Sequence, residues 1–195
     1  MPKRTPRTTK ASNSALLVEV AWEVCNQVGG IYTVIRSKAP VMVDNWSGHF
    51  CMIGPYINKN ILAELEPLED AADVFGLAAS NLRKKGYDVI YAEWLITGKP
   101  RVVLLNPNAI EEKVLNVLKY LLWKNHSIQT PDKNELINQV IGFAYLTKLF
   151  IDELVKKGYD EKRGIKFLEL KDGRHDVPTW AKAFPEFLKW GWGSE

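Results

Sequence analysis

The sequence has few of the residues that build metal centres and disulfide frameworks. Its 195 residues include two cysteines and three histidines. Cys25 and Cys51 lack the spacing of metal ligands, and no cluster of ligand side chains accompanies them. Each lies in or beside an apolar segment, where a buried free thiol in a reducing compartment is expected. The pattern predicts no metal site and a cytoplasmic protein.

Long hydrophobic runs are also missing. No stretch reaches the roughly 18 apolar residues that a membrane-spanning helix needs. The apolar run that follows the first basic residues is short and carries Glu19 and Glu23, so it does not resemble a secretory signal. The sequence therefore predicts no membrane segment.

Net charge is small and unevenly distributed. The formal charge is +3, and much of it lies in Met1–Lys10, where Lys and Arg alternate with Pro and Thr. This composition predicts a disordered basic tail over residues 1–14. Elsewhere basic and acidic residues are interleaved, which argues against nucleic-acid binding. The length and the hydrophobic share of 46% suit one soluble globular domain or slightly more.

A strand, a glycine turn and a helix begin the ordered part of the chain. Ala15–Val20 reads as a buried strand, and the apolar residues of Ile31–Lys38 follow helical spacing. Gly29 and Gly30 lie between them. Because glycine has no Cβ, a ligand can approach the backbone there. The free N–H groups at the start of the helix favour an anion. From spacing alone, an ordinary structural turn is the more common meaning of this pattern.

Strands and helices then alternate. Strands are predicted at His49–Ile53, Tyr87–Ala92 and Arg101–Leu105, and helices from Asp70 to Lys85, at Ile110–Lys124 and at Asp132–Lys157. Pro40 and the polar residues 44–48 predict the end of the first helix. The acidic stretch Asn58–Asp73 is interpreted as a solvated helix face or loop. The alternation predicts an α/β fold with a mostly parallel sheet, whose ligands bind beyond the carboxyl ends of the strands.

The helix at Ile110–Lys124 is predicted from the spacing of its apolar residues, Val114, Val117, Leu118, Leu121 and Leu122. The helix at Asp132–Lys157 is expected to turn an apolar stripe toward a core. This stripe consists of Leu136, Val140, Phe143, Thr147, Phe150 and Leu154.

Four segments carry a resemblance to a known family. They are Glu23–Ala39 with its Asn-Gln-Val-Gly-Gly-Ile-Tyr-Thr run, Ile53–Tyr56, Glu93–Leu105 with Trp-Leu-Ile-Thr-Gly-Lys-Pro, and the later part from Leu122–Trp123 through Ile128 and Pro131 to the Asn134–Leu149 helix. In this order they resemble the N-terminus of the UDP-glucose-using glycogen synthase family of animals and fungi. The resemblance covers about residues 16–157, and four ordered motifs are more specific than any one of them.

The resemblance implies the N-terminal half of a GT-B glycosyltransferase, a Rossmann-like sheet with flanking helices. The implied reaction transfers glucose from UDP-glucose to an α-1,4-glucan with retention, and needs neither metal nor cofactor. The implied diphosphate-binding residues are Gln27, Val28, Gly29, Gly30, Tyr32 and Thr33; no catalytic residue is assigned. Gln27 stands where relatives usually carry Lys or Arg, so its hydrogen bond to a phosphate would be neutral and weaker. A homo-oligomer is left open.

The resemblance ends near Gly158. Residues 15–160 are therefore expected to form a partial Rossmann-like N-terminal domain, and residues 161–195 a divergent segment. That segment ends in Trp180–Trp192, read as an aromatic helix face packed on the sheet or, alternatively, a partner surface. Because family members are about three times longer, the chain is interpreted as a fragment, a truncated product or a descendant with another use. The isolated chain is therefore expected to be catalytically incomplete.

The alternative function is a non-catalytic Rossmann-like module that binds a sugar nucleotide, a glucan or a partner protein. A nicotinamide-dependent dehydrogenase is disfavoured because the glycine turn lacks the G-x-G-x-x-G pattern.

Overall fold

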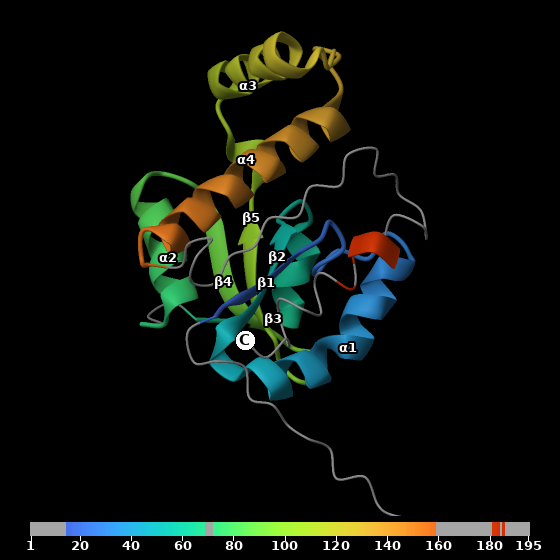
Figure 1. Ribbon diagram of the computed structural model, residues 1–195, viewed down its shortest axis with the longest axis vertical. Coiled ribbons are helices and arrows are strands. Elements are labelled where there is room, and N and C mark those ends of the chain that lie inside the picture. Colours follow the sequence, from blue (N-terminus) through green and yellow to red (C-terminus); the bar gives the residue numbers. More distant parts are fainter. Residues whose placement is uncertain (1–14, 69–71, 159–180, 184, 186–195) are drawn as a thin grey trace, which may run out of the picture.

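The computed structural model describes residues 15–68, 72–158, 181–183 and 185, and within them a five-stranded sheet lies between helices (Figure 1). The strands are β1 (Leu17–Val20), β2 (Phe50–Pro55), β3 (Leu65–Pro67), β4 (Val89–Trp94) and β5 (Arg101–Leu105). The α-helices are α1 (Gly30–Trp46), α2 (Val74–Lys84), α3 (Glu112–His126) and α4 (Glu135–Val155). Three short 3₁₀ segments are η1 (Ser47–His49), η2 (Lys59–Glu64) and η3 (Pro107–Ala109).

The sheet has the strand order β1-β2-β5-β4-β3. β1, β2 and β5 are parallel, whereas β4 is antiparallel to both β5 and β3. The turn between β4 and β5 is too short for the crossover that parallel neighbours require. All strands of the described sheet except β4 therefore run the same way. The predicted α/β fold with a mostly parallel, Rossmann-like sheet is confirmed.

The sheet separates two hydrophobic cores, because successive side chains of a strand point to opposite faces. In β2, Phe50 and Met52 belong to the core beneath α1. Cys51 and Ile53 belong to the core beneath α2 and α4. Since all four side chains are at most 1% exposed, β2 lies at the centre of a three-layer α/β/α arrangement.

The first helix ends within the polar residues 44–48, as predicted, but Pro40 does not end it. α1 continues through Pro40 to Trp46, although proline removes one helical hydrogen bond. The compensation is tertiary: Ala39 and Trp46 are buried in the core, and Gly98 packs directly against Pro40. A Cβ on Gly98, which has φ of 88°, would lie 2.7 Å from the Cα of Pro40.

The end of α2 shows why β4 begins two residues later than expected. The N–H of Gly86 donates to the carbonyl of Arg83 at 2.9 Å, and the N–H of Tyr87 donates to the carbonyl of Leu82 at 3.1 Å. This is the Schellman pattern of a helix C-terminus. The predicted stop at Lys84–Gly86 is confirmed, and Tyr87 belongs to that stop rather than to the strand.

Strand β3 was missed by the sequence analysis. The acidic stretch read as a helix face or loop contains η2 and the three-residue β3, which pairs with β4 at the edge of the sheet. Only Leu65 of β3 is buried, while Glu66 and Pro67 are exposed. A three-residue edge strand with a charge and a proline is too short to show the alternation of apolar and polar residues that predicts a strand.

Helix α3 and the first half of α4 extend beyond the sheet (Figure 1). The α4 stripe prediction is confirmed from Phe143 onward, because Phe143, Thr147, Phe150 and Leu154 are buried. It is wrong for Leu136 and Val140, which are 58% and 47% exposed. The helix predicted at Ile110–Lys124 is present as α3, and two of the apolar residues that predicted it are exposed: Val117 is 53% exposed and Leu121 is 41% exposed.

Predictions for the tail 1–14 and for most of 161–195 lie outside the described residues; residues 181–183 and 185 are helical. Among the helices that the structure describes, none combines the length and apolar character required to cross a bilayer.

Candidate functional site

The loop between β1 and α1, residues 21–29, lies at the carboxyl edge of the parallel strands. The N–H of Ala21 donates to the carbonyl of Ile53 at 3.1 Å, which continues the pairing of β1 with β2. Val24 then passes so close to β2 that a Cβ on Gly54 would lie 2.5 Å from the Val24 carbonyl oxygen. Cys25 adopts a left-handed backbone conformation, with φ of 56°, which non-glycine residues visit rarely. The loop is therefore held tightly against the sheet.

A carboxylate caps the start of α1. The side-chain oxygen Oε2 of Glu23 accepts hydrogen bonds from the N–H of Gly29 at 2.6 Å and from the N–H of Tyr32 at 3.0 Å. Gly29 is the N-cap of α1 and has no side chain to cap the helix itself. In a capping box the N-cap and N3 side chains satisfy these two amides reciprocally. Here Glu23, which is 9% exposed, satisfies both.

The two amides between the capped ones belong to Gly30 and Ile31, the first positions of α1. Among the described residues, no side chain accepts a hydrogen bond from either. A Cβ on Gly30 would meet no atom within 4 Å, and Ile31 is 50% exposed. These amides carry the positive end of the helix dipole, so an anion placed there is stabilised.

The structure brings the predicted site residues together on one turn but gives them different surroundings. Gln27, Val28, Gly29, Gly30 and Thr33 are all exposed; Val28 is 68% exposed.

Tyr32 is the exception among the predicted site residues, because its side chain is buried. Its ring centroid lies 5.5 Å from that of Trp94, and its hydroxyl accepts a hydrogen bond from the Arg36 guanidinium at 3.3 Å. Burial raises the pKa of Tyr32. The Tyr32 side chain packs in the core, and its N–H is the group that meets Glu23.

The cations near the loop are engaged elsewhere. The Arg36 guanidinium lies over the Tyr32 ring, 5.2 Å from its centroid. The Lys38 ammonium pairs with the Glu19 carboxylate at 2.5 Å. These contacts agree with leaving both residues out of the predicted site.

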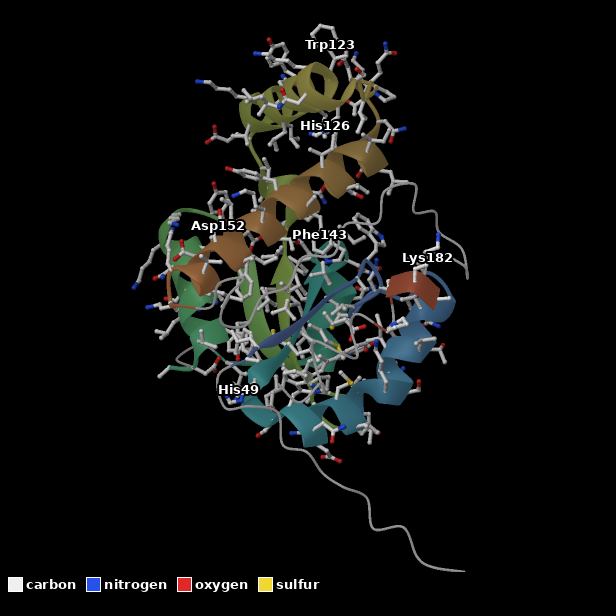
Figure 2. The ribbon with its side chains drawn as sticks, in the orientation of Figure 1. His49, Trp123, His126, Phe143, Asp152 and Lys182 are labelled. Atoms are coloured by element: carbon white, nitrogen blue, oxygen red, sulfur yellow. The ribbon has the colours of Figure 1, made fainter. Side chains whose placement is uncertain are left out.

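Each of the other three sequence motifs contributes a residue that packs against this loop or helix. Gly54 of the second motif underlies Val24, and Trp94 of the third packs on Tyr32. Phe143 of α4 points toward the sheet (Figure 2), and its ring centroid lies 5.8 Å from that of Trp22 in an edge-on contact. Segments far apart in sequence thus pack against residues 21–32.

Sequence reasoning missed Glu23 as a functional-site residue. It was noted only as a charge in the first apolar run and as the first residue of a family motif, because its side chain reaches the helix only after the loop has folded back. The available signal was a carboxylate a few residues ahead of a helix whose N-cap is glycine, since glycine leaves the cap position without an acceptor.

The two histidines in the described part of the chain, His49 and His126, lie outside the β1–α1 loop. His49 lies in η1, next to the amino end of β2 and so at the sheet edge opposite the loop. His126 is the last residue of α3, and Figure 2 shows it on the side of that helix opposite Trp123. No group of three or more metal-ligand side chains occurs within residues 15–68 and 72–158.

The fold and the loop define a Rossmann-like α/β protein with an open helix N-terminus at the ligand edge of its sheet. A family model described as glycogen synthase matches residues 19–175. The chain is 38% identical over 152 residues to the glycogen [starch] synthase of Neurospora crassa, and 33% identical over 172 residues to the liver enzyme of Rattus norvegicus. It is 34% identical over 149 residues to isoform 1 of Saccharomyces cerevisiae. The chain belongs to the glycogen synthase family.

These matches cover most of this chain but a small part of each relative. The three alignments include 78%, 87% and 72% of the chain, and 21%, 24% and 21% of the relatives. The chain therefore spans about a fifth to a quarter of the length of the curated relatives it matches.

Proposed function

We propose that this chain supplies the N-terminal, Rossmann-like part of a glucosyltransferase that moves glucose from UDP-glucose to an α-1,4-glucan with retention. The observation that carries the proposal is the glycogen synthase match over residues 19–175, which includes the whole β1–α1 loop. The exposed amides of Gly30 and Ile31 support it, because they lie at the edge where ligands of such sheets bind.

In this proposal the loop stabilises the departing UDP. As the bond between glucose and the diphosphate breaks, negative charge grows on the phosphate oxygens. Preorganised N–H donors aimed at that charge lower the barrier, and loss of one such donor costs about 2.7–4 kcal/mol in comparable oxyanion sites. The donors assigned to this role are the amides of Gly30 and Ile31, with the exposed side chains of Gln27 and Thr33 beside them.

The exposed residues next to the two glycines also suit the binding of a diphosphate. Val28 and Gly29 present backbone and a small apolar surface next to the amides, so a bulky diphosphate can approach. Gln27 donates through a neutral amide, and a neutral hydrogen bond is weaker than a charge-assisted one. We infer that much of the donor affinity resides in groups other than Gln27.

Residues 15–160 are assigned to a partial donor-binding domain in this proposal. The relatives' greater length leaves room for the other groups that the reaction requires, including the catalytic residues. A cytoplasmic location suits the two free cysteines, which are both buried, and a homo-oligomer remains compatible with it.

The second candidate is a non-catalytic module that binds a sugar nucleotide, a glucan or a partner protein. The short alignment, about a fifth to a quarter of each relative, favours it for the isolated chain.

Two measurements on the 195-residue chain separate these candidates. Transfer of radiolabelled glucose from UDP-glucose to glycogen supports the transferase. UDP-glucose binding by calorimetry without transfer supports the module. Absence of both transfer and binding of UDP-glucose or glucan contradicts the transferase and the sugar-binding forms of the module, and leaves only the module that binds a partner protein.

A further inference from the structure

Glu23 places a negative charge beside the loop that is proposed to hold a diphosphate. Its carboxylate is 9% exposed and occupies the amides of Gly29 and Tyr32. Two roles fit that position, and they have opposite consequences. A plug would imitate the ligand and leave when the ligand arrives. A positioning residue would stay and hold the neighbouring amides in place.

The contacts favour the second role. A Cβ on Gly29 would lie 3.3 Å from Oε1 of Glu23, so the side chain lies against the turn itself. If Glu23 left, two amides would lose their acceptor, and the carboxylate would have to leave a loop that is fastened on both sides.

Contacts of the residues next to Glu23 hold the loop in place. Val24 is 0% exposed and lies against Gly54. On the other side, the Asn26 side-chain amide donates to the carbonyl of Trp22 at 3.2 Å. The backbone that carries Glu23 is thus held between two anchored residues, which leaves little freedom for the side chain to swing outward.

We propose that Glu23 is a positioning residue of the donor site: it caps α1 in place of the missing Gly29 side chain and so leaves the Gly30 and Ile31 amides as the pair presented to the donor diphosphate. This inference rests on the proposed function. It adds a residue that touches neither substrate nor reacting atoms and acts through the turn.

The two roles predict opposite changes in UDP-glucose affinity when Glu23 is replaced. Replacing a positioning residue loosens the turn, so Glu23→Ala weakens UDP-glucose binding roughly five- to tenfold, the size expected for loss of one helix cap. Glu23→Gln retains one acceptor oxygen and stays within about threefold of the native chain, by the same reasoning. Removing a plug would instead tighten binding in both variants, because a competing negative charge disappears.

The experiment measures UDP-glucose affinity by calorimetry for the native chain, Glu23→Ala and Glu23→Gln, with two matched controls. Glu66→Ala removes an exposed carboxylate from β3, at the opposite edge of the sheet from β1, and reports any effect of net charge. Glu153→Gln lowers global stability at α4 without touching the loop, and reports any effect of stability alone. Both controls are expected to bind like the native chain.

Amide spectra of the native chain at saturating UDP-glucose keep the test informative if Glu23→Ala does not fold. A positioning residue stays in place, so the Gly29 and Tyr32 amide resonances should change less than those of Gly30 and Ile31, whereas a displaced plug would change them as strongly. Tighter or unchanged binding in Glu23→Ala, or a Gly29 and Tyr32 response as large as that of Gly30 and Ile31, overturns the positioning role. Absence of UDP-glucose binding to the native chain overturns the proposed function instead, and the inference with it.

Discussion

Of two glycines near the loop, one is crowded by its neighbours and the other is open, so the lack of a side chain matters for a different reason at each position. Gly54 lies beneath Val24, where a Cβ would come within 2.5 Å of a carbonyl oxygen. Gly30 opens the first turn of α1, where a Cβ would meet nothing within 4 Å. The first glycine is therefore required for packing, and the second leaves room above the helix end.

Gly54→Ala should lower the free energy of unfolding by about 1–3 kcal/mol, because the added methyl group overpacks the contact between β2 and the loop. Gly30→Ala is the matched control and should change it by less than about 0.5 kcal/mol. Urea unfolding of the three proteins measures both values. Equal stability of the Gly54 and Gly30 variants would contradict the packing role of Gly54.

A buried carboxylate joins the ends of α2 and α4. Glu153 is 4% exposed and accepts hydrogen bonds from the ammonium groups of Lys156 at 2.8 Å and Lys85 at 2.5 Å, and from the Asn81 side chain at 3.0 Å. The hydrogen bonds from Lys156 and Lys85 lower the pKa of Glu153 to about 2. The charged form is thus favoured in the folded state.

A lowered pKa in the folded state makes stability depend on pH with a definite sign. The stabilisation is present above the unfolded-state pKa of Glu153 and is lost as the pH falls toward 2. Because both lysines are about half exposed, we expect roughly 2–3 kcal/mol rather than the full value of the shift. Unfolding free energies between pH 7 and pH 2 should therefore fall less steeply in Glu153→Gln than in the native chain. Parallel curves would contradict this assignment.

At the scale of elements, α4 has two halves with different neighbours. From Phe143 onward it packs on the sheet through Phe143, Phe150 and Leu154. Its first half contacts α3 and the η3 segment, where the Gln139 side chain donates to that of Asn108 at 3.2 Å. Lys119 of α3 closes the connecting loop by donating to the carbonyls of Pro131 and Asp132. The helix pair therefore depends less on the sheet than the rest of the fold does.

Two tryptophans test this division. Trp94 in β4 is fully buried and donates to Glu64 at 3.2 Å, whereas Trp123 in α3 is 55% exposed. Trp94→Ala should cost about 3–5 kcal/mol of unfolding free energy, and Trp123→Ala less than about 1 kcal/mol. Chemical denaturation of both variants measures the difference. A comparable loss in Trp123→Ala would show that α3 is part of the cooperative core.

The elements also show what could be predicted from the sequence. β5 was predicted with its observed bounds, and β1, the glycine turn and the start of α1 were predicted from apolar spacing alone. The apolar stripe of α3 was visible too, but a stripe does not say which surface covers it. The Glu23 cap was not predictable from periodicity, because it depends on a side chain that crosses six residues to reach Gly29.

At the scale of the whole molecule, each core contains one free cysteine. Cys25 lies in the core beneath α1, and Cys51 lies in the core beneath α2 and α4. Both are buried, and burial raises the pKa of both thiols, so neither is expected to react in the folded state. Each thiol therefore reports the opening of its own layer.

If the two layers unfold together, both thiols should react with a thiol reagent at the same slow rate. Cys25→Ala and Cys51→Ala variants with closely matched stability allow each rate to be measured alone. Faster reaction of Cys25 would show that the α1 layer and its loop open independently of the α2–α4 layer.

The most direct test of the account is an amide-resolved titration of the native chain with UDP-glucose. The predicted result is a saturable shift of the Gly30 and Ile31 amide resonances, with smaller changes at Gly29 and Tyr32, and no such response to glucose alone. Unmoved Gly30 and Ile31 resonances at saturating UDP-glucose would contradict the claim that this turn holds the diphosphate of a sugar nucleotide.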